Sequence, residues 1–150
     1  MSEMTTEDLA FIDRNEIASG SLSEEEEVYK ENIIDHYKNP HHKHAMEGYI
    51  IRHSELNPLC GDQLTVFLKI DGMEVADISW DGKGCAISQA SMSLLSDRVV
   101  HMSISQVKGL SKEDIFAMLG IPISFVRTKC ALLSLKTVQN GIAAYEGEKR

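Results

Sequence analysis

The sequence lacks several features that would each identify a different class of protein. It has no run of about 18 apolar residues, so no membrane-spanning helix is expected. It has no excess of basic residues, because residues 28–150 balance acids and bases and the net charge of −8 arises in residues 1–27. A nucleic-acid-binding surface needs a basic face, so nucleic acid is not an expected partner.

Cysteine is scarce, and its scarcity argues against a disulfide framework. The chain has three cysteines in 150 residues, an odd number at long spacings. The N-terminus shows no signal peptide, which predicts a cytoplasmic protein. In the reducing cytoplasm, a few widely spaced cysteines indicate metal binding or catalysis rather than cross-links.

The length and composition predict one globular domain preceded by an acidic arm. The 150 residues are enough to bury a core, and 43% are apolar and 25% charged, as in ordinary soluble proteins. We place the arm at residues 1–22, with a short helix or a disordered segment in residues 1–20. The domain then covers residues 23–150.

The hydrophobic pattern predicts an α+β fold, in which helices pack against a small three-stranded, mainly antiparallel sheet. Asp71-Gly72 between two alternating segments indicates a β-hairpin. Capping patterns at Ser23 and Ser111 each indicate the start of a helix. The expected strands cover residues 48–53, 63–70 and 73–80. The expected helices cover residues 23–39, 85–99, 111–120 and 125–145.

Each cysteine lies in a local frame that favours a reactive thiolate. Cys60 lies in the turn-forming sequence Asn-Pro-Leu-Cys-Gly-Asp, and Cys85 follows a glycine-rich break before a helix. Cys130 follows two cations, Arg127 and a lysine, at the start of another helix. Helix N-termini and nearby cations both favour the deprotonated sulfur, which is the form that reacts and binds metals.

The three thiols and one carboxylate form a possible four-ligand set: Cys60, Asp62, Cys85 and Cys130. Such a mixed set binds zinc tetrahedrally, or holds an iron–sulfur cluster less firmly than four thiolates would. The alternative for any single cysteine is a small, buried hydrophobic side chain. The residues alone therefore leave zinc and iron–sulfur chemistry both open.

Three motifs around these residues resemble the U-type iron–sulfur cluster assembly family, which comprises IscU, SufU and the N-terminal domain of NifU. The resemblance covers residues 28–147. The motifs are Asn-Pro-Leu-Cys-Gly-Asp at 57–62, Gly-Cys-Ala-Ile-Ser-Gln-Ala-Ser at 84–91 and Arg-Thr-Lys-Cys-Ala-Leu-Leu at 127–133. Residues 35–40 resemble the family's first-helix signature.

The resemblance implies a SufE/NifU-like fold and gives roles to single residues. Cys60, Asp62, Cys85 and Cys130 match the family's ligands for Zn²⁺, or for the iron of a [2Fe–2S] cluster. Cys60 or Cys130 would accept persulfide sulfur from a cysteine desulfurase, and Arg127 is included in this reactive group. The implied recipients of the sulfur are downstream apo iron–sulfur proteins or a cluster scaffold.

Two features match different branches of that family. Lys129 stands where the cluster-scaffold branch has histidine, and with Arg127 it resembles the SufU branch. The spacing of 45 residues between Cys85 and Cys130 instead resembles the compact scaffold branch, although that branch's chaperone-docking stretch is absent. We therefore expect a sulfurtransferase-like zinc-dependent sulfur carrier. The alternatives are a non-enzymatic [2Fe–2S] scaffold and a structural zinc domain without sulfur transfer.

Other polar residues are expected to be structural. Three histidines lie in one loop: His41, His42 and His44. Binding of a divalent metal ion is the alternative to their being solvated. Asp35 and His36 are adjacent on a helix and do not face each other, so they are not expected to form an acid–base pair. The serines in residues 88–93 have no evident His and Asp partners, which argues against a serine hydrolase.

Overall fold

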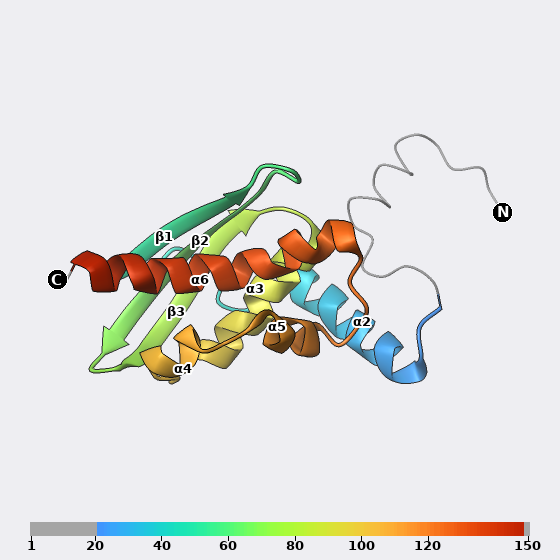
Figure 1. Ribbon diagram of the computed structural model, residues 1–150, viewed down its shortest axis with the longest axis horizontal. Coiled ribbons are helices and arrows are strands. Elements are labelled where there is room, and N and C mark those ends of the chain that lie inside the picture. Colours follow the sequence, from blue (N-terminus) through green and yellow to red (C-terminus); the bar gives the residue numbers. More distant parts are fainter. Residues whose placement is uncertain (1–20, 149–150) are drawn as a thin grey trace.

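A computed structural model describes residues 21–148 of the chain. The helix or disordered arm expected in residues 1–20 lies outside the described residues. The elements are α2 (Glu24–Lys38), β1 (Ile51–Asn57), β2 (Asp62–Asp71), β3 (Glu74–Lys83), α3 (Ala86–Val99), α4 (Ile104–Lys108), α5 (Lys112–Leu119), the 3₁₀ turn η1 (Phe125–Arg127) and α6 (Thr128–Glu148). The fold is α+β, as the sequence predicts (Figure 1).

The sheet is a three-stranded antiparallel meander with the order β1-β2-β3. The predicted Asp-Gly hairpin is confirmed: Asp71 pairs with Glu74, and Gly72 adopts a left-handed conformation with φ of +62°. A second turn joins β1 to β2, where Asn57 pairs with Asp62. This second turn carries Cys60, so the sheet register places the first cysteine motif at one end of the sheet.

The predicted strand at residues 48–53 is wrong in its bounds, because β1 begins at Ile51 and ends at Asn57. Gly48 has φ of +72°, which is outside the extended region, so the strand begins later. The second half of β1 was not predicted as strand because its two half-buried positions, His53 and Glu55, are polar. These side chains bond to each other, which allows polar groups to occupy the inner face of the strand.

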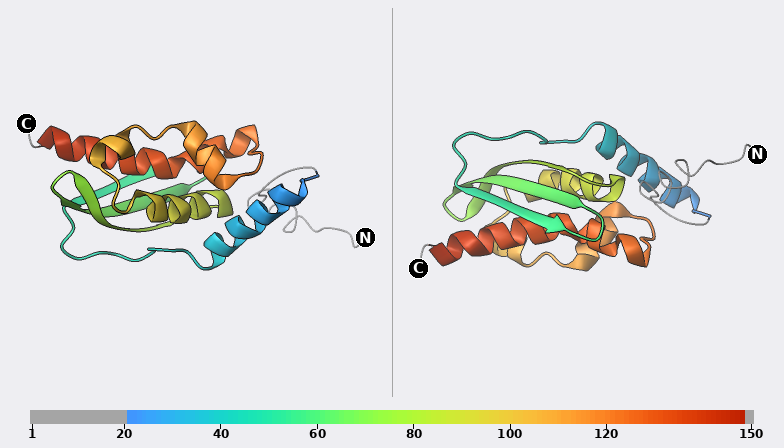
Figure 2. Two further views of the ribbon diagram at one scale, coloured as in Figure 1. Left: turned by 90° about the horizontal axis from the view of Figure 1, so that it is seen from below. Right: turned by 90° about the horizontal axis from the view of Figure 1, so that it is seen from above.

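Helices cover one face of the sheet. The long helix α6 packs along β1 and β2, α3 packs against β3, and α2 packs on α3. Figure 2 shows α6 on one side of the sheet and residues 39–50 passing on the other side. Within residues 21–148, no helix combines the length and the apolar character that crossing a membrane requires.

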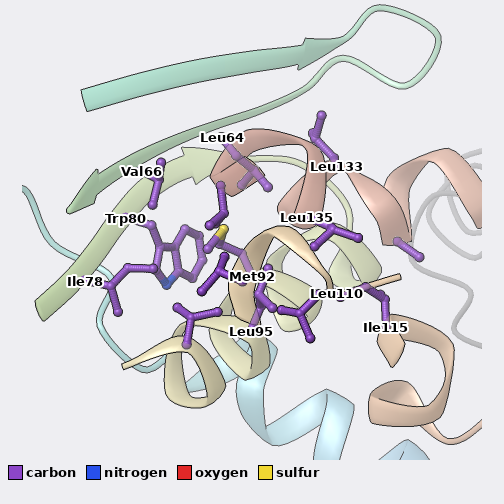
Figure 3. Close-up of a cluster of buried hydrophobic side chains, with 14 of the residues drawn as sticks. Leu64, Val66, Ile78, Trp80, Met92, Leu95, Leu110, Ile115, Leu133 and Leu135 are labelled. Carbon is purple, nitrogen blue, oxygen red and sulfur yellow. The ribbon is translucent and has the colours of Figure 1, made fainter. Parts of the chain in front are cut away.

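The core lies between the sheet and these helices (Figure 3). Trp80 of β3 is fully buried against Met92 and Leu95 of α3, and its indole Nε1–H donates to the carbonyl oxygen of His41 at 2.8 Å. A buried indole needs such a partner, because an unpaired buried donor is costly. The segment after α2 is therefore tied to the core through Trp80.

The helix boundaries follow their capping residues. Ser23 with Glu26 and Ser111 with Asp114 form the two predicted capping boxes. A third box, at Ser103, begins the short helix α4, which was not predicted because five residues carry too little periodicity. The last predicted helix is divided into η1 and α6, and α6 continues beyond the predicted end at residue 145.

Candidate functional site

The three cysteine motifs meet at one end of the sheet although they lie far apart in the sequence. Cys60 is in the turn between β1 and β2, where its N–H and that of Gly61 donate to the carbonyl oxygen of Asn57. Cys85 is the N-cap residue of α3, and Cys130 lies in the first turn of α6. The predicted helix-start positions of Cys85 and Cys130 are thus confirmed.

The structure brings together three of the four side chains predicted as ligands: Cys60, Asp62 and Cys130. Cys60 Sγ lies 3.3 Å from Cys130 Sγ, and both cysteines are free thiols. The ligand atoms of Cys60, Asp62 and Cys130 all lie within 4.8 Å of one another. Cys85 adjoins this group through its backbone N–H, which donates to Asp62 Oδ1 at 2.9 Å, while its own sulfur lies outside the group.

The four side chains differ in accessibility. Asp62, Cys85 and Cys130 are 1%, 2% and 0% exposed, whereas Cys60 is half-buried. A bulky partner or reagent can therefore reach Cys60 more readily than the other two thiols. Three of the four side chains are thus buried, and Cys60 supplies the accessible sulfur of the site.

The donor set fits a zinc or iron ion. Asp62 Oδ2 is buried and has no hydrogen-bond partner among the described residues, while Oδ1 is held by the Cys85 N–H. An unpaired buried carboxylate oxygen is costly unless another group satisfies it. A cation bound between this oxygen and the neighbouring sulfurs would satisfy it, and such a mixture of thiolate and carboxylate ligands suits zinc and iron.

The pKa values of the two buried thiols, Cys85 and Cys130, shift in opposite directions. Interaction with the neighbouring Cys130 thiol lowers the pKa of Cys85 to about 6, with help from the Ser88 backbone and the Arg127 cation, against the effect of burial. The same interaction, together with burial, raises the pKa of Cys130. The direction at Cys85 agrees with the predicted thiolate, and the thiolate at Cys130 remains a prediction.

Gly84 permits the close approach between the second motif and Asp62. Its φ is +155°, and a Cβ at this position would collide with the Asp62 carboxylate and lie 2.6 Å from Ser88 Oγ. Only glycine fits between the start of α3 and the carboxylate. The glycine-rich break before Cys85 is thus a requirement of the site.

Two residues that contact the site cysteines were not proposed as site residues from the sequence. Asn57 is 6% exposed, and its Nδ2 approaches Cys130 Sγ at 3.7 Å while its Oδ1 accepts from the Leu59 N–H. Ser88 donates to the Cys85 carbonyl oxygen at 3.0 Å. Both belong to the quoted motifs, but their roles depend on contacts that spacing does not reveal.

An apolar surface surrounds the accessible sulfur. A cavity of about 470 Å³ is lined by Asn57, Leu59, Cys60, Phe125, Val126, Thr128 and Lys129. Three of its apolar side chains are exposed to solvent: Leu59 by 76%, Phe125 by 94% and Val126 by 72%. Lys129 is exposed and adds a positive charge at the rim, whereas Arg127 is buried at 8% exposure.

Most residues expected to be structural lie outside this site, and the exception is Ser88, which bonds to the Cys85 carbonyl oxygen. Asp35 accepts from Asn39 Nδ2, and His36 bonds to Ser93 Oγ, so Asp35 and His36 have separate partners. Ser91 donates to the Ala131 carbonyl oxygen, where it joins α3 to α6. The loop histidines His41 and His42 bond to Asp97 rather than to a site cysteine.

The comparisons with known proteins agree on one family for this chain. The family described as "NifU-like N terminal domain" matches residues 28–150. The zinc-dependent sulfurtransferase SufU of Bacillus subtilis (strain 168) is 34% identical over 137 residues, which cover 80% of this chain and 92% of that protein. The iron–sulfur cluster assembly scaffold protein IscU of Streptococcus pyogenes serotype M1 is 35% identical over 102 residues, which cover 67% of this chain and 58% of that protein.

A solved structure shows the same fold. The N-terminal part of a nitrogen-fixing NifU-like protein from Brucella abortus superposes with a TM-score of 0.68, at 20% identity. The superposition covers 82% of this chain and 97% of the solved chain. The arrangement of sheet and helices is therefore shared across distant sequences.

Proposed function

Since this chain belongs to the family of the NifU-like N-terminal domain, we propose that it serves iron–sulfur cluster assembly as a zinc-dependent carrier of sulfur. One observation supports Cys60 as the sulfur acceptor: Cys60 is half-buried, while Cys85 and Cys130 are buried. The donor is a cysteine desulfurase, and the recipients are apo iron–sulfur proteins or a cluster scaffold.

The transfer step is a thiol exchange. The Cys60 thiolate attacks the terminal sulfur of the persulfide on the desulfurase cysteine. A sulfur–sulfur bond forms at Cys60, the sulfur–sulfur bond of the donor breaks, and the donor cysteine leaves as a thiolate. No oxidant or reductant is consumed, and the rate depends on the thiolate fraction and on access to the attacking sulfur.

The metal of the carrier would be held by Cys60, Asp62, Cys85 and Cys130. When bound, zinc supplies positive charge that keeps its thiolate ligands deprotonated at neutral pH. The protein's own contribution is to hold Asp62 in place through the Cys85 N–H and to place the Arg127 cation where it favours the thiolate of Cys85. The role of Arg127 is thus to stabilise the Cys85 thiolate by its positive charge, without reacting with sulfur itself.

The second candidate is a scaffold on which a [2Fe–2S] cluster is built and then transferred. The same four ligands serve iron, and the spacing of 45 residues between Cys85 and Cys130 resembles the compact scaffold branch. Lys129 favours the carrier, because histidine holds this position in the scaffold branch. A purely structural zinc domain, the third candidate, would have no use for an accessible sulfur beside an apolar cavity.

The test is sulfur transfer from a desulfurase. The anaerobically purified protein is incubated with a cysteine desulfurase and ³⁵S-labelled cysteine, and the label is located by peptide analysis. We expect label on Cys60, loss of the label in Cys60→Ser, and a colourless protein with one zinc ion at the cysteine site. Absence of label on every cysteine would refute the sulfur-acceptor function, and a brown protein containing iron and sulfide would favour the scaffold.

A further inference from the structure

A second group of metal-ligating side chains lies away from the cysteine site. It consists of His36 on α2, His41 and His42 in the following loop, and Asp97 near the end of α3. Asp97 is twelve residues beyond Cys85, and at 1.5 Å per residue α3 separates the two groups by about 18 Å. The proposed sulfur-transfer site therefore does not explain this cluster.

The carboxylate of Asp97 is the centre of the cluster. Its Oδ2 lies 2.6 Å from His41 Nδ1, and its Oδ1 lies 2.9 Å from His42 Nε2. The ring of His36 lies 4.4 Å from that of His41, and the ligand atoms of His36, His41 and Asp97 all lie within 4.8 Å of one another. Three imidazoles thus converge on one carboxylate.

The backbone around the histidines is held by the core. His42 has a left-handed backbone with φ of +61°, an uncommon conformation for a residue with a side chain. Its carbonyl oxygen accepts from the Trp80 backbone N–H at 3.0 Å. The His41 N–H donates to Ser93 Oγ at 2.8 Å, and Trp80 Nε1–H donates to the His41 carbonyl oxygen. Both histidines are thereby fixed in position beside Asp97.

The cluster of His36, His41, His42 and Asp97 is not well explained as a set of hydrogen bonds that only tethers the loop. The backbone contacts to Trp80 and Ser93 already hold the loop without either imidazole. The side chains of His41 and Asp97 are 47% and 41% exposed, and ion pairs at such sites contribute about 0–1 kcal/mol. The convergence of three imidazoles on one carboxylate therefore adds little to stability, but it supplies a donor set.

We propose that His36, His41 and Asp97 bind a divalent first-row transition-metal ion, with His42 as the neighbouring fourth donor. Imidazole with a single carboxylate is a ligand set that suits zinc and ferrous iron. His36 Nδ1 bonds to Ser93 Oγ at 2.7 Å, which orients the ring and leaves Nε2 for the metal. With metal–ligand bonds of about 2.1 Å, tetrahedral ligands lie about 3.4 Å apart, so the exposed side chains of His41 and Asp97 need only small rotations.

Metal counting tests the proposal on the full-length chain. The metal-free protein is equilibrated anaerobically with Zn²⁺, Fe²⁺ or Mg²⁺ and exchanged into metal-free buffer. The number of metal ions per protein chain is then measured by inductively coupled plasma mass spectrometry. The site variants are Asp97→Asn and the double variant His41→Gln/His42→Gln. The control is His44→Gln, because His44 lies in the same loop and its imidazole bonds to the Ala45 carbonyl oxygen rather than to Asp97.

We expect the wild-type protein and the control to retain one more equivalent of Zn²⁺ or Fe²⁺ than the site variants, and to retain no Mg²⁺. Retention of one of the two ions alone identifies which metal the site takes. Equal counts in wild-type protein and site variants would overturn the proposal. NMR of the wild-type imidazoles gives a test without substitutions: unchanged His41 and His42 resonances at saturating Zn²⁺ would also overturn it.

Cobalt substitution separates this proposal from the proposed function. Sulfur bound to Co²⁺ gives a charge-transfer absorption that nitrogen and oxygen ligands do not give. Loss of one Co²⁺ equivalent in Asp97→Asn with this absorption unchanged assigns the lost ion to the histidine cluster. One equivalent bound in the wild type without the sulfur absorption would support the histidine site and reject metal binding by the cysteines.

Discussion

The backbone N–H of Cys85 donates to Asp62 Oδ1 at 2.9 Å, which joins the start of α3 to the first residue of β2. This bond leaves Asp62 Oδ2 buried and unpaired beside Cys60 and Cys130. The carboxylate is therefore held in a fixed orientation by one oxygen and presents the other to the sulfurs. A preorganised ligand of this kind loses little conformational freedom when a cation binds.

Substitution of Asp62 by alanine should weaken zinc binding by more than about tenfold, because it removes both the buried oxygen and its support from Cys85. Competition with a chromophoric zinc chelator measures the affinity. Asp81→Ala is the control, since Asp81 is an exposed carboxylate on β3. Unchanged zinc affinity would contradict a ligand role for Asp62, and stronger retention of a [2Fe–2S] chromophore would favour the scaffold function.

Gly84→Ala should disrupt the metal site, because the added Cβ would collide with the Asp62 carboxylate. Zinc affinity should fall at least as far as in Asp62→Ala, and the melting temperature of the metal-free protein should also fall. Gly72→Ala is the matched control: Gly72 has φ of +62° but has no atom within 4 Å of an added Cβ. The control should lose about 1–2 kcal/mol of stability from backbone strain and keep its zinc affinity. Equal zinc affinities in the two variants would contradict the steric argument.

Alkylation of the metal-free protein should modify Cys60 first. The low pKa of Cys85 favours its thiolate, but its side chain is 2% exposed, so access decides the order. Peptide mass spectrometry after a short iodoacetamide pulse should find Cys60 modified about tenfold more than the other two cysteines. Protein unfolded in guanidinium is the control and should react at all three. Preferential modification of Cys85 in the folded protein would reverse our assignment of the accessible thiol.

The stability of the metal-free protein should rise with pH between about 6 and 9. In the folded state the pKa of Cys85 is about 6, against an ordinary value of 9.0, so the folded chain loses this proton while the unfolded chain keeps it. This contribution is fully present above pH 9 and is lost as the pH falls through 6. Urea unfolding at several pH values measures it, with Cys85→Ser as the control. The same pH dependence in both proteins would show that another group is responsible.

Phe125→Asp should reduce sulfur transfer from the desulfurase and leave zinc affinity unchanged. Phe125 is 94% exposed in the lining of the cavity beside Cys60, where an apolar side chain favours contact with a partner. Transfer rates at several desulfurase concentrations should show weaker binding of the partner. Met73→Asp is the control, because Met73 is 68% exposed in the turn between β2 and β3, at the opposite end of those strands from the cysteine turn. An equal effect of the two substitutions would indicate a general charge effect.

The sequence predicted the elements whose signals are local. Asp71-Gly72 has the composition of a two-residue turn, and the capping boxes at Ser23 and Ser111 each lie within four residues. The bounds of β1 could not be predicted in this way. Its inward positions His53 and Glu55 are polar and satisfy each other, so the alternation of apolar residues that marks a strand is missing.

By itself, the sequence determined which residues are the candidate ligands, because the three cysteine motifs and Asp62 are identifiable from residue type and spacing. Only the tertiary structure decided how these residues differ: Cys60 is accessible, Cys85 and Cys130 are buried, and one Asp62 oxygen is unpaired. It also placed His41 and His42 against Asp97, more than fifty residues away in the chain. Burial and long-range contacts arise from the packing of distant segments, and the spacing of residues along the chain does not encode them.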